Sequence, residues 1–203
     1  MKSVDALASL FIGGMAAVLM LAVSRNLLLP SAVTLHLTPF LVAFPLLTLA
    51  AIAVGSLLGR RVRVLYQFTK YALVGGLNFL VDLGVLNLLI AVTDTSHGVY
   101  ANMLKAISFL VAVTWSFFWN KFWTFGSPSA SRAGRQFFGF LMVSAVGLLI
   151  NVAAFAVINN NVALGGGIPA RTWANVAAAG AAVTSIFWNF LGYKFVVFGD
   201  RNA

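Results

Sequence analysis

The sequence predicts an all-α integral membrane protein with six transmembrane helices, the last four of which form a duplicated helix hairpin. Its 203 residues are 61% hydrophobic and only 8% charged, whereas soluble domains carry about 25% charged residues. The apolar residues are gathered into six long runs with short polar segments between them. Residues 68–125 and 137–198 also repeat each other.

Each apolar run provides the roughly 20 residues that a membrane-spanning helix needs. The predicted spans are residues 7–28, 40–58, 68–92, 102–123, 137–158 and 173–197. The segments between them are rich in Gly, Pro, Ser and Asn, which break helices. The first run lacks a small-residue cleavage site and precedes a second apolar run, so we expect a retained helix rather than a signal peptide.

The basic residues predict the orientation of these helices. With the N-terminus in the cytoplasm, three of the 13 basic residues fall outside, namely Arg25, Lys105 and Arg171. The others fall inside: Lys2, Arg60, Arg61, Arg63, Lys70, Lys121, Arg132, Arg135, Lys194 and Arg201. The positive-inside rule therefore predicts that both termini are cytoplasmic. We assign the net charge of +9 to contact with anionic lipid headgroups, and expect no nucleic acid partner.

The internal repeat aligns in two blocks. At a shift of 69 residues, Phe68, Tyr71, Val74 and Asp82 meet Phe137, Phe140, Val143 and Asn151. At a shift of 73 residues, Trp115, Phe117, Lys121, Phe122 and Phe125 meet Trp188, Phe190, Lys194, Phe195 and Phe198. Each repeat holds two spans, so both enter from the cytoplasm and form a parallel repeat. We predict two extra N-terminal helices in residues 1–63 and a four-helix domain in residues 64–203.

Both repeats end in an aromatic block that contains one lysine, FFWNKFWTF at 117–125 and FLGYKFVVF at 190–198. An aromatic belt at the membrane interface, with a lysine that reaches the headgroups, explains this pattern. A lysine between aromatic rings also suits a clamp for a lipid phosphate. Both interpretations stay open for Lys121 and Lys194, with Asn120 and Asn189 placed deeper.

Asp82 is the only acidic residue inside a predicted span. A carboxylate at such a depth costs several kcal/mol unless it is protonated, hydrated or paired, so Asp82 marks a functional site. Asn78 lies one turn before it, and Lys105 in the next span lies within plausible reach. The second repeat has Asn151 and Ala178 at the positions of Asp82 and Lys105. The paired loss of charge suggests an ion pair, and a Lys105 that extends outward is the alternative.

The sequence does not indicate an enzymatic activity. There is no cysteine, and His36 and His97 fall in predicted loops. A Ser-His-Asp set, a carboxylate pair and a phosphate-binding P-loop are all missing. We therefore expect neither catalysis nor a metal or cofactor. Gly75 and Gly76 in the third predicted span are expected to allow close helix packing.

The stretches FTKYALVGGLNFLVDLGVLNLLI and SFFWNKFWTF resemble the GtrA-like family of small membrane proteins, over residues 67–198. The matching residues are Gly75, Gly76, Asn78, Asp82, Asn120, Lys121, Trp123, Thr124 and Phe125. In the second copy Asn189 and Lys194 match. Ser116 and Tyr193 stand where the family has asparagine. Members usually have four spans, so the resemblance does not explain the first two helices.

The resemblance implies a flippase for a polyprenyl-phosphate-linked monosaccharide in a bacterial-type cytoplasmic (inner) membrane, serving surface polysaccharide synthesis or glycosylation beside a membrane glycosyltransferase. The predicted substrate-binding residues are Lys70, Asn78, Asp82, Lys105, Asn120, Lys121, Trp123, Asn189 and Lys194. We expect a homo-oligomer, most simply a dimer, because four helices leave little room for a closed path. The alternatives are a non-transporting anchor for the glycosyltransferase and a small-solute or proton-coupled transporter that uses Asp82.

Overall fold

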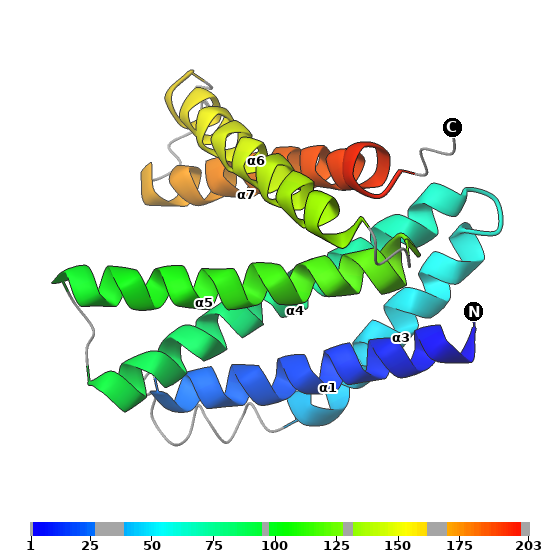
Figure 1. Ribbon diagram of the computed structural model, residues 1–203, viewed down its shortest axis with the longest axis horizontal. Coiled ribbons are helices and arrows are strands. Elements are labelled where there is room, and N and C mark those ends of the chain that lie inside the picture. The colour runs from blue at the N-terminus through cyan, green and yellow to red at the C-terminus, as the bar shows by residue number, and fades with distance from the viewer. Residues whose placement is uncertain (1, 27–38, 95–97, 128–131, 162–169, 200–203) are drawn as a thin grey trace. The chain divides into compact units, whose positions relative to one another are not determined.

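The computed structural model describes residues 2–26, 39–94, 98–127, 132–161 and 170–199 (Figure 1). These residues are almost entirely helical, and no strand occurs among them. The elements are α1 (Ser3–Asn26), α3 (Phe40–Leu58), α4 (Arg63–Thr93), α5 (Gly98–Trp119), η1 (Asn120–Thr124), α6 (Ala133–Asn161), α7 (Ala170–Gly192) and η2 (Tyr193–Val197). The prediction of an all-α chain with six long helices is confirmed.

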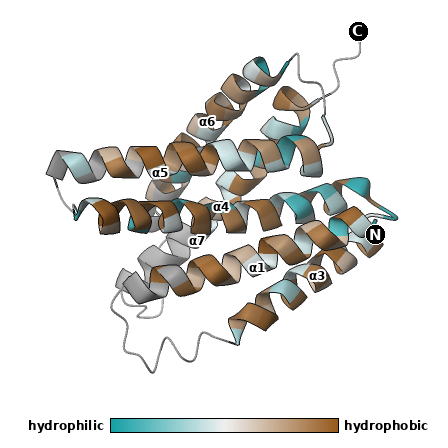
Figure 2. Ribbon diagram, turned by 60° about the horizontal axis from the view of Figure 1, so that its bottom comes forward, coloured by the Kyte–Doolittle hydropathy of each residue, from teal (hydrophilic) through white to brown (hydrophobic). Residues whose placement is uncertain are grey.

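Four of the helices are long and apolar enough to cross a membrane, judged on the described residues. They cover Ser3–Leu21, Phe40–Leu58, Arg63–Thr93 and Ala133–Ile158. Figure 2 shows hydrophobic residues along most of α1, α3, α4 and α5. Many of these side chains are exposed, as Leu47, Leu88 and Leu149 are, which suits helices that face lipid. The orientation of the termini stays a prediction.

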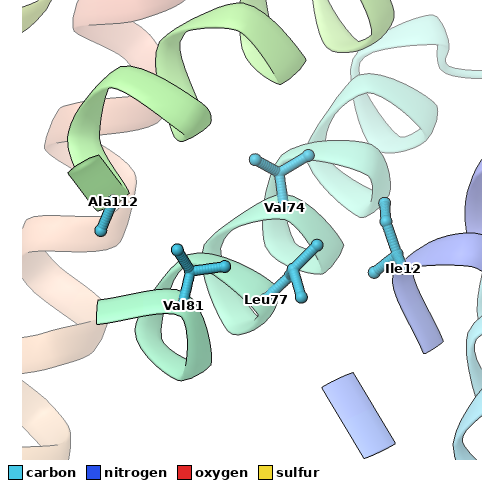
Figure 3. Packing of buried hydrophobic residues seen from close by; sticks show 5 residues of the cluster. All are labelled: Ile12, Val74, Leu77, Val81 and Ala112. Atoms are coloured by element: carbon cyan, nitrogen blue, oxygen red, sulfur yellow. The ribbon is translucent and has the colours of Figure 1, made fainter. Parts of the chain in front are cut away.

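The chain divides into two compact units, residues 1–126 and 127–203. The first unit holds α1, α3, α4, α5 and η1, and its core contains Val74, Leu77 and Val81 of α4. Ile12 of α1 and Ala112 of α5 lie on either side of these three residues in Figure 3. The two N-terminal helices are therefore packed against the first hairpin, while the predicted domain boundary at residues 63–64 stays a prediction.

Close packing in the first unit depends on small residues of α1 and α3. A Cβ atom on Gly13 would lie 2.6 Å from the Cα of Pro45 and 2.7 Å from the carbonyl oxygen of Phe44. At the same crossing, the Thr48 hydroxyl lies 2.7 Å from the Ser9 carbonyl and can donate to it. Small residues and interhelical hydrogen bonds are the usual means of helix packing in lipid.

Gly75 and Gly76 do not take part in such packing within the described residues. A Cβ atom at either position would meet no atom within 4 Å, so the first unit does not show the close packing expected there. The close approach to α4 occurs instead from α3. There a Cβ on Gly59 would lie 2.6 Å from Tyr66, and one on Gly55 would overlap Thr69.

The helices α5 and α7 each end in one turn of π-helix, which the sequence did not predict. The amide of Phe125 donates to the carbonyl of Asn120 at 2.9 Å, and the amide of Phe198 donates to the carbonyl of Tyr193 at 2.8 Å. These two turns, Asn120–Thr124 and Tyr193–Val197, are separated by the same 73 residues as the aromatic blocks. Single π turns inside helices occur frequently at functional sites.

We predict that Gly13→Ala weakens the fold whereas Gly14→Ala does not. Gly13 meets the backbone of α3, but a Cβ on its neighbour Gly14 would meet nothing within 4 Å. Overpacking should lower the free energy of unfolding of Gly13→Ala by about 1–3 kcal/mol. Gly14→Ala should be neutral or more stable, because alanine favours helices. Thermal unfolding in detergent compares the two variants, and equal midpoints would contradict the prediction.

Candidate functional site

Asp5, near the start of α1, is the centre of a buried polar cluster. Its side chain is 3% exposed. The carboxylate pairs with the Lys70 ammonium at 2.5 Å and accepts hydrogen bonds from the Tyr66 hydroxyl at 2.7 Å and the Trp123 indole at 3.0 Å. Tyr66 and Lys70 belong to α4 and Trp123 to η1. One carboxylate therefore joins α1 to α4 and to the π turn.

Lys70 is held from several directions. Its ammonium lies 4.6 Å from the ring centre of Tyr66 and 5.1 Å from that of Trp123, distances that allow cation–π attraction. It also lies 3.4 Å from the carbonyl oxygen of Trp123. Carbonyl groups in the last turn of a helix lack donors within the helix. Lys70 thus supplies a donor at the end of η1.

The sequence predicted that Lys70 binds substrate, but it did not predict that Lys70 pairs with Asp5. The first span was predicted to begin at residue 7, which placed Asp5 in a polar tail, whereas α1 begins at Ser3. The available signal was the scarcity of acidic residues, since the chain has only four. An acidic residue in such an apolar chain needs a partner.

A cavity of about 650 Å³ opens beside this cluster. Four basic residues line it, Lys2, Arg60, Arg63 and Lys70, against the single carboxylate of Asp5 among the described lining residues. The excess of positive charge attracts anions. Four aromatic residues complete the wall, namely Tyr66, Phe122, Trp123 and Phe125. The cavity is suited to an anionic ligand that also presents an apolar face.

The aromatic block of η1 has two sides. Trp115, Trp119 and Trp123 pack against the core of the first unit, with neighbouring ring centres 6.0 and 5.7 Å apart. Phe118 and Phe122 stack on each other and are exposed. The interfacial-belt interpretation therefore suits exposed Phe118 and Phe122, although Phe122 also borders the cavity. The three tryptophans form part of the interior, and Trp123 also lines the cavity.

The lysines of the two π turns differ in burial. Lys121 is 1% exposed, and its ammonium lies 5.7 Å from the ring centre of Phe122. Lys194 is half-buried, at 6.0 and 5.3 Å from the ring centres of Phe190 and Phe195. Neither lines the cavity of about 650 Å³. Of the predicted site residues, the structure gathers Lys70 and Trp123 in that cavity, and the phosphate-binding role of Lys121 and Lys194 stays a prediction.

Asp82 accepts a hydrogen bond from the Ser108 hydroxyl of α5 at 2.6 Å. Its counterpart Asn151 in α6 donates to the Ser185 hydroxyl of α7 at 3.2 Å. Both positions thus bond to a serine of the following helix, a partner that the sequence reasoning missed. Lys105 lies three residues before Ser108, but its side chain is outside the described part of the chain, so its pairing with Asp82 stays a prediction.

Three of the predicted site residues are asparagines with a buried, unsatisfied oxygen. The Oδ1 atoms of Asn78, Asn120 and Asn189 have no hydrogen-bond partner among the described residues. The Asn120 amide donates to the Ser116 carbonyl at 2.9 Å, which leaves only its oxygen unused. Buried polar atoms usually have partners. A buried oxygen without a partner is costly, so a donor from a ligand or from water that reached these atoms would stabilise them.

A family model described as "GtrA/DPMS, transmembrane domain" matches residues 70–198. The match begins at Lys70 and continues through η2, and it leaves out α1 and α3. No curated protein and no solved structure matches the chain. Asp5, Arg60 and Arg63 lie outside the match, so the cavity combines family and non-family residues.

We predict that Asp5 and Lys70 are energetically coupled. Either Asp5→Ala or Lys70→Ala leaves one charge buried without its partner, which should cost about 3–5 kcal/mol. The double variant should lose less than the sum of the two single losses, because it removes both charges. The measurement is a double-mutant cycle on thermal unfolding. Arg61→Ala, which removes an exposed cation that does not line the cavity, is the control, and additive losses would refute the coupling.

We predict that Asp82→Asn has little effect on stability. Asparagine can keep a hydrogen bond to Ser108, as Asn151 does with Ser185. Lys105→Ala should destabilise the protein by stranding the carboxylate, and Asp82→Asn in the same chain should restore stability. Thermal unfolding of the three variants checks this. Equal effects of Lys105→Ala with and without Asp82→Asn would remove the pairing.

Proposed function

Because the chain belongs to the GtrA/DPMS transmembrane-domain family, we propose that it translocates a polyprenyl-phosphate-linked monosaccharide across the cytoplasmic membrane. The family indicates membrane proteins that handle lipid-linked sugars and are generally non-catalytic. Translocation of the lipid, rather than its synthesis, is the proposed step. Surface polysaccharide synthesis or glycosylation is the process that it would serve.

The cavity beside Asp5 is the observation that carries this proposal. A polyprenyl-phosphate sugar has an anionic phosphodiester, a hydroxyl-rich sugar and a long apolar tail. Arg60 and Arg63 line the cavity and can bind phosphate oxygens through two parallel hydrogen bonds. The rings of Tyr66 and Trp123 offer the sugar a flat apolar surface. The exposed apolar faces of the helices suit the tail.

Asn78 and Asp82, one turn apart, form a short row of polar residues on α4 beyond this cavity. Asn78 and Asp82 lie roughly two and three turns beyond Lys70, which brings Asp82 about 18 Å along the helix axis. This is more than half of a hydrocarbon core about 30 Å thick. The unsatisfied oxygen of Asn78 and the Asp82–Ser108 pair can exchange hydrogen bonds with sugar hydroxyls. We propose this row as part of the sugar's path.

Two further features belong to the proposal. Translocation runs downhill, driven by synthesis of the lipid-linked sugar on one side and its consumption on the other, in a complex with the membrane glycosyltransferase that makes it. The working form is a homodimer, the commonest symmetric assembly. The exposed apolar side chains of α3, such as Val42, Leu46 and Val54, provide a surface that lipid or the second copy can cover.

We predict that liposomes containing the purified protein move labelled polyprenyl-phosphate sugar between leaflets. Arg60→Gln/Arg63→Gln should lower the initial rate at least about tenfold, by removing two charge-assisted contacts. Asp82→Asn should abolish movement. Arg61→Gln, at the same turn but outside the cavity, should retain the wild-type rate. The measurement is accessibility of the label to a reagent added outside.

Three results would contradict the proposal in different ways. Wild-type protein that moves no lipid but co-purifies with the glycosyltransferase would be an anchor or accessory subunit. Full movement by Asp82→Asn would remove Asp82 from the path. Proton flux without lipid movement would favour a proton-coupled transporter of another solute.

A further inference from the structure

The sequence repeat extends further toward the N-terminus than the hydrophobic helices. RVLYQF at residues 63–68 aligns with RAGRQF at residues 132–137, at the same shift of 69. Arg63 thereby corresponds to Arg132, and Gln67 to Gln136. Arg63 is the first residue of α4, and Arg132 directly precedes α6. The two hairpins therefore begin with the same polar pattern.

The second unit has its own cavity at this place, with a volume of about 450 Å³. Arg132, Arg135, Gln136 and Gly139 line it from the start of α6. Val196, Val197 and Gly199 line it from η2 and the residues that follow. All of these residues belong to the second unit, so the cavity does not depend on how the two units are placed.

The two cavities are lined by corresponding positions of the repeat. The shift of 69 places Arg132, Gln136 and Gly139 on Arg63, Gln67 and Lys70. The shift of 73 places Val196, Val197 and Gly199 on Trp123, Thr124 and Gly126. Each cavity thus lies between the first turn of one helix and the π turn that ends the next. Two separate units of the chain have formed the same kind of cavity.

We propose that the second cavity is an independent binding site for the phosphate headgroup of an anionic lipid, with Arg132 and Arg135 as its phosphate ligands. Both arginines are exposed and free to turn toward a ligand, and guanidinium groups bind phosphate oxygens in pairs. No acidic residue is among the described residues that line the cavity. The proposal shares its ligand class with the proposed function but does not require translocation.

The turn that carries the arginines is fixed by Gln136. This side chain is buried, and its Nε2 donates to the Ser127 hydroxyl at 2.9 Å. The backbone amide of Gln136 also donates to the carbonyl of Arg132 at 2.9 Å. The start of α6 is thereby held in place while the charged ends of the arginines stay in water. Such a fixed turn lowers the ordering cost of binding.

The two cavities differ at several aligned positions, and the charge differs most at the position of Lys70. Lys70 of the first cavity is paired with Asp5, whereas the second has Gly139 in the corresponding place. A Cβ on Gly139 would lie 3.6 Å from Val197, so the position has room for a side chain. The ligand of the second cavity would therefore be held by arginines alone. Each chain would bind two phosphate headgroups, one per repeat.

The test is the number of lipids that one chain binds, measured by native mass spectrometry with polyprenyl phosphate as the probe. Wild-type protein should bind two molecules. Arg132→Gln/Arg135→Gln and Arg60→Gln/Arg63→Gln should each bind one, and the combination of all four changes none. Arg61→Gln should bind two. A parallel titration with inorganic phosphate shows whether the site also binds the free anion. If it does not, binding requires the lipid.

A second variant tests the site without removing the arginines, in case their replacement prevents folding. Gly139→Leu fills the cavity and leaves both arginines in place, and it should also bind one lipid. Two lipids on Arg132→Gln/Arg135→Gln, or a single lipid on wild-type protein, would overturn the site. Protein that binds two lipids but moves none would overturn the proposed function alone. Protein that moves lipid while Arg132→Gln/Arg135→Gln still binds two would overturn the second site alone.

Discussion

The buried ion pair between Asp5 and Lys70 is the constraint on which the arrangement of the first unit depends. A charge removed from water is stable only when a partner and further hydrogen bonds satisfy it. Tyr66 and Trp123 provide those bonds to Asp5, so α1, α4 and the π turn must meet at one place. The basic cavity is a consequence, because the same meeting brings Arg60 and Arg63 beside the aromatic rings.

Charged residues are scarce in this chain, and the polar groups of the first unit that the structure describes fall into two groups along α4. Cations and aromatic rings lie at one end of the hairpins, where a headgroup would be. Asn78 and Asp82 lie further along α4, and Ser108 of α5 donates to Asp82. Small residues permit the close contact between α1 and α3, as Gly13 does against Pro45. Apolar side chains are then free to face lipid.

Hydrophobicity was sufficient to predict most helices, and α3 occupies the predicted residues 40–58. It failed at the start of α4, because Arg63 and Gln67 on either side of Val64 and Leu65 made a helical turn look like part of a loop. The partners of Asp5 are 61 and 118 residues away, a choice that only tertiary packing decides. Whether a glycine permits close contact also depends on the facing helix, which explains Gly75 and Gly76. The π turns depend on a backbone register that residue types do not specify.

The distance along the chain between Asp5 and Trp123 has a consequence for biosynthesis. Trp123 is made 118 residues after Asp5, which at about 5–20 residues per second takes roughly 6–24 s. During that time the carboxylate has no indole to bind, and the first helix enters the membrane before its final neighbours exist. Tyr66 and Lys70 are made earlier than Trp123, so Asp5 acquires its full set of partners only once the first hairpin has been made.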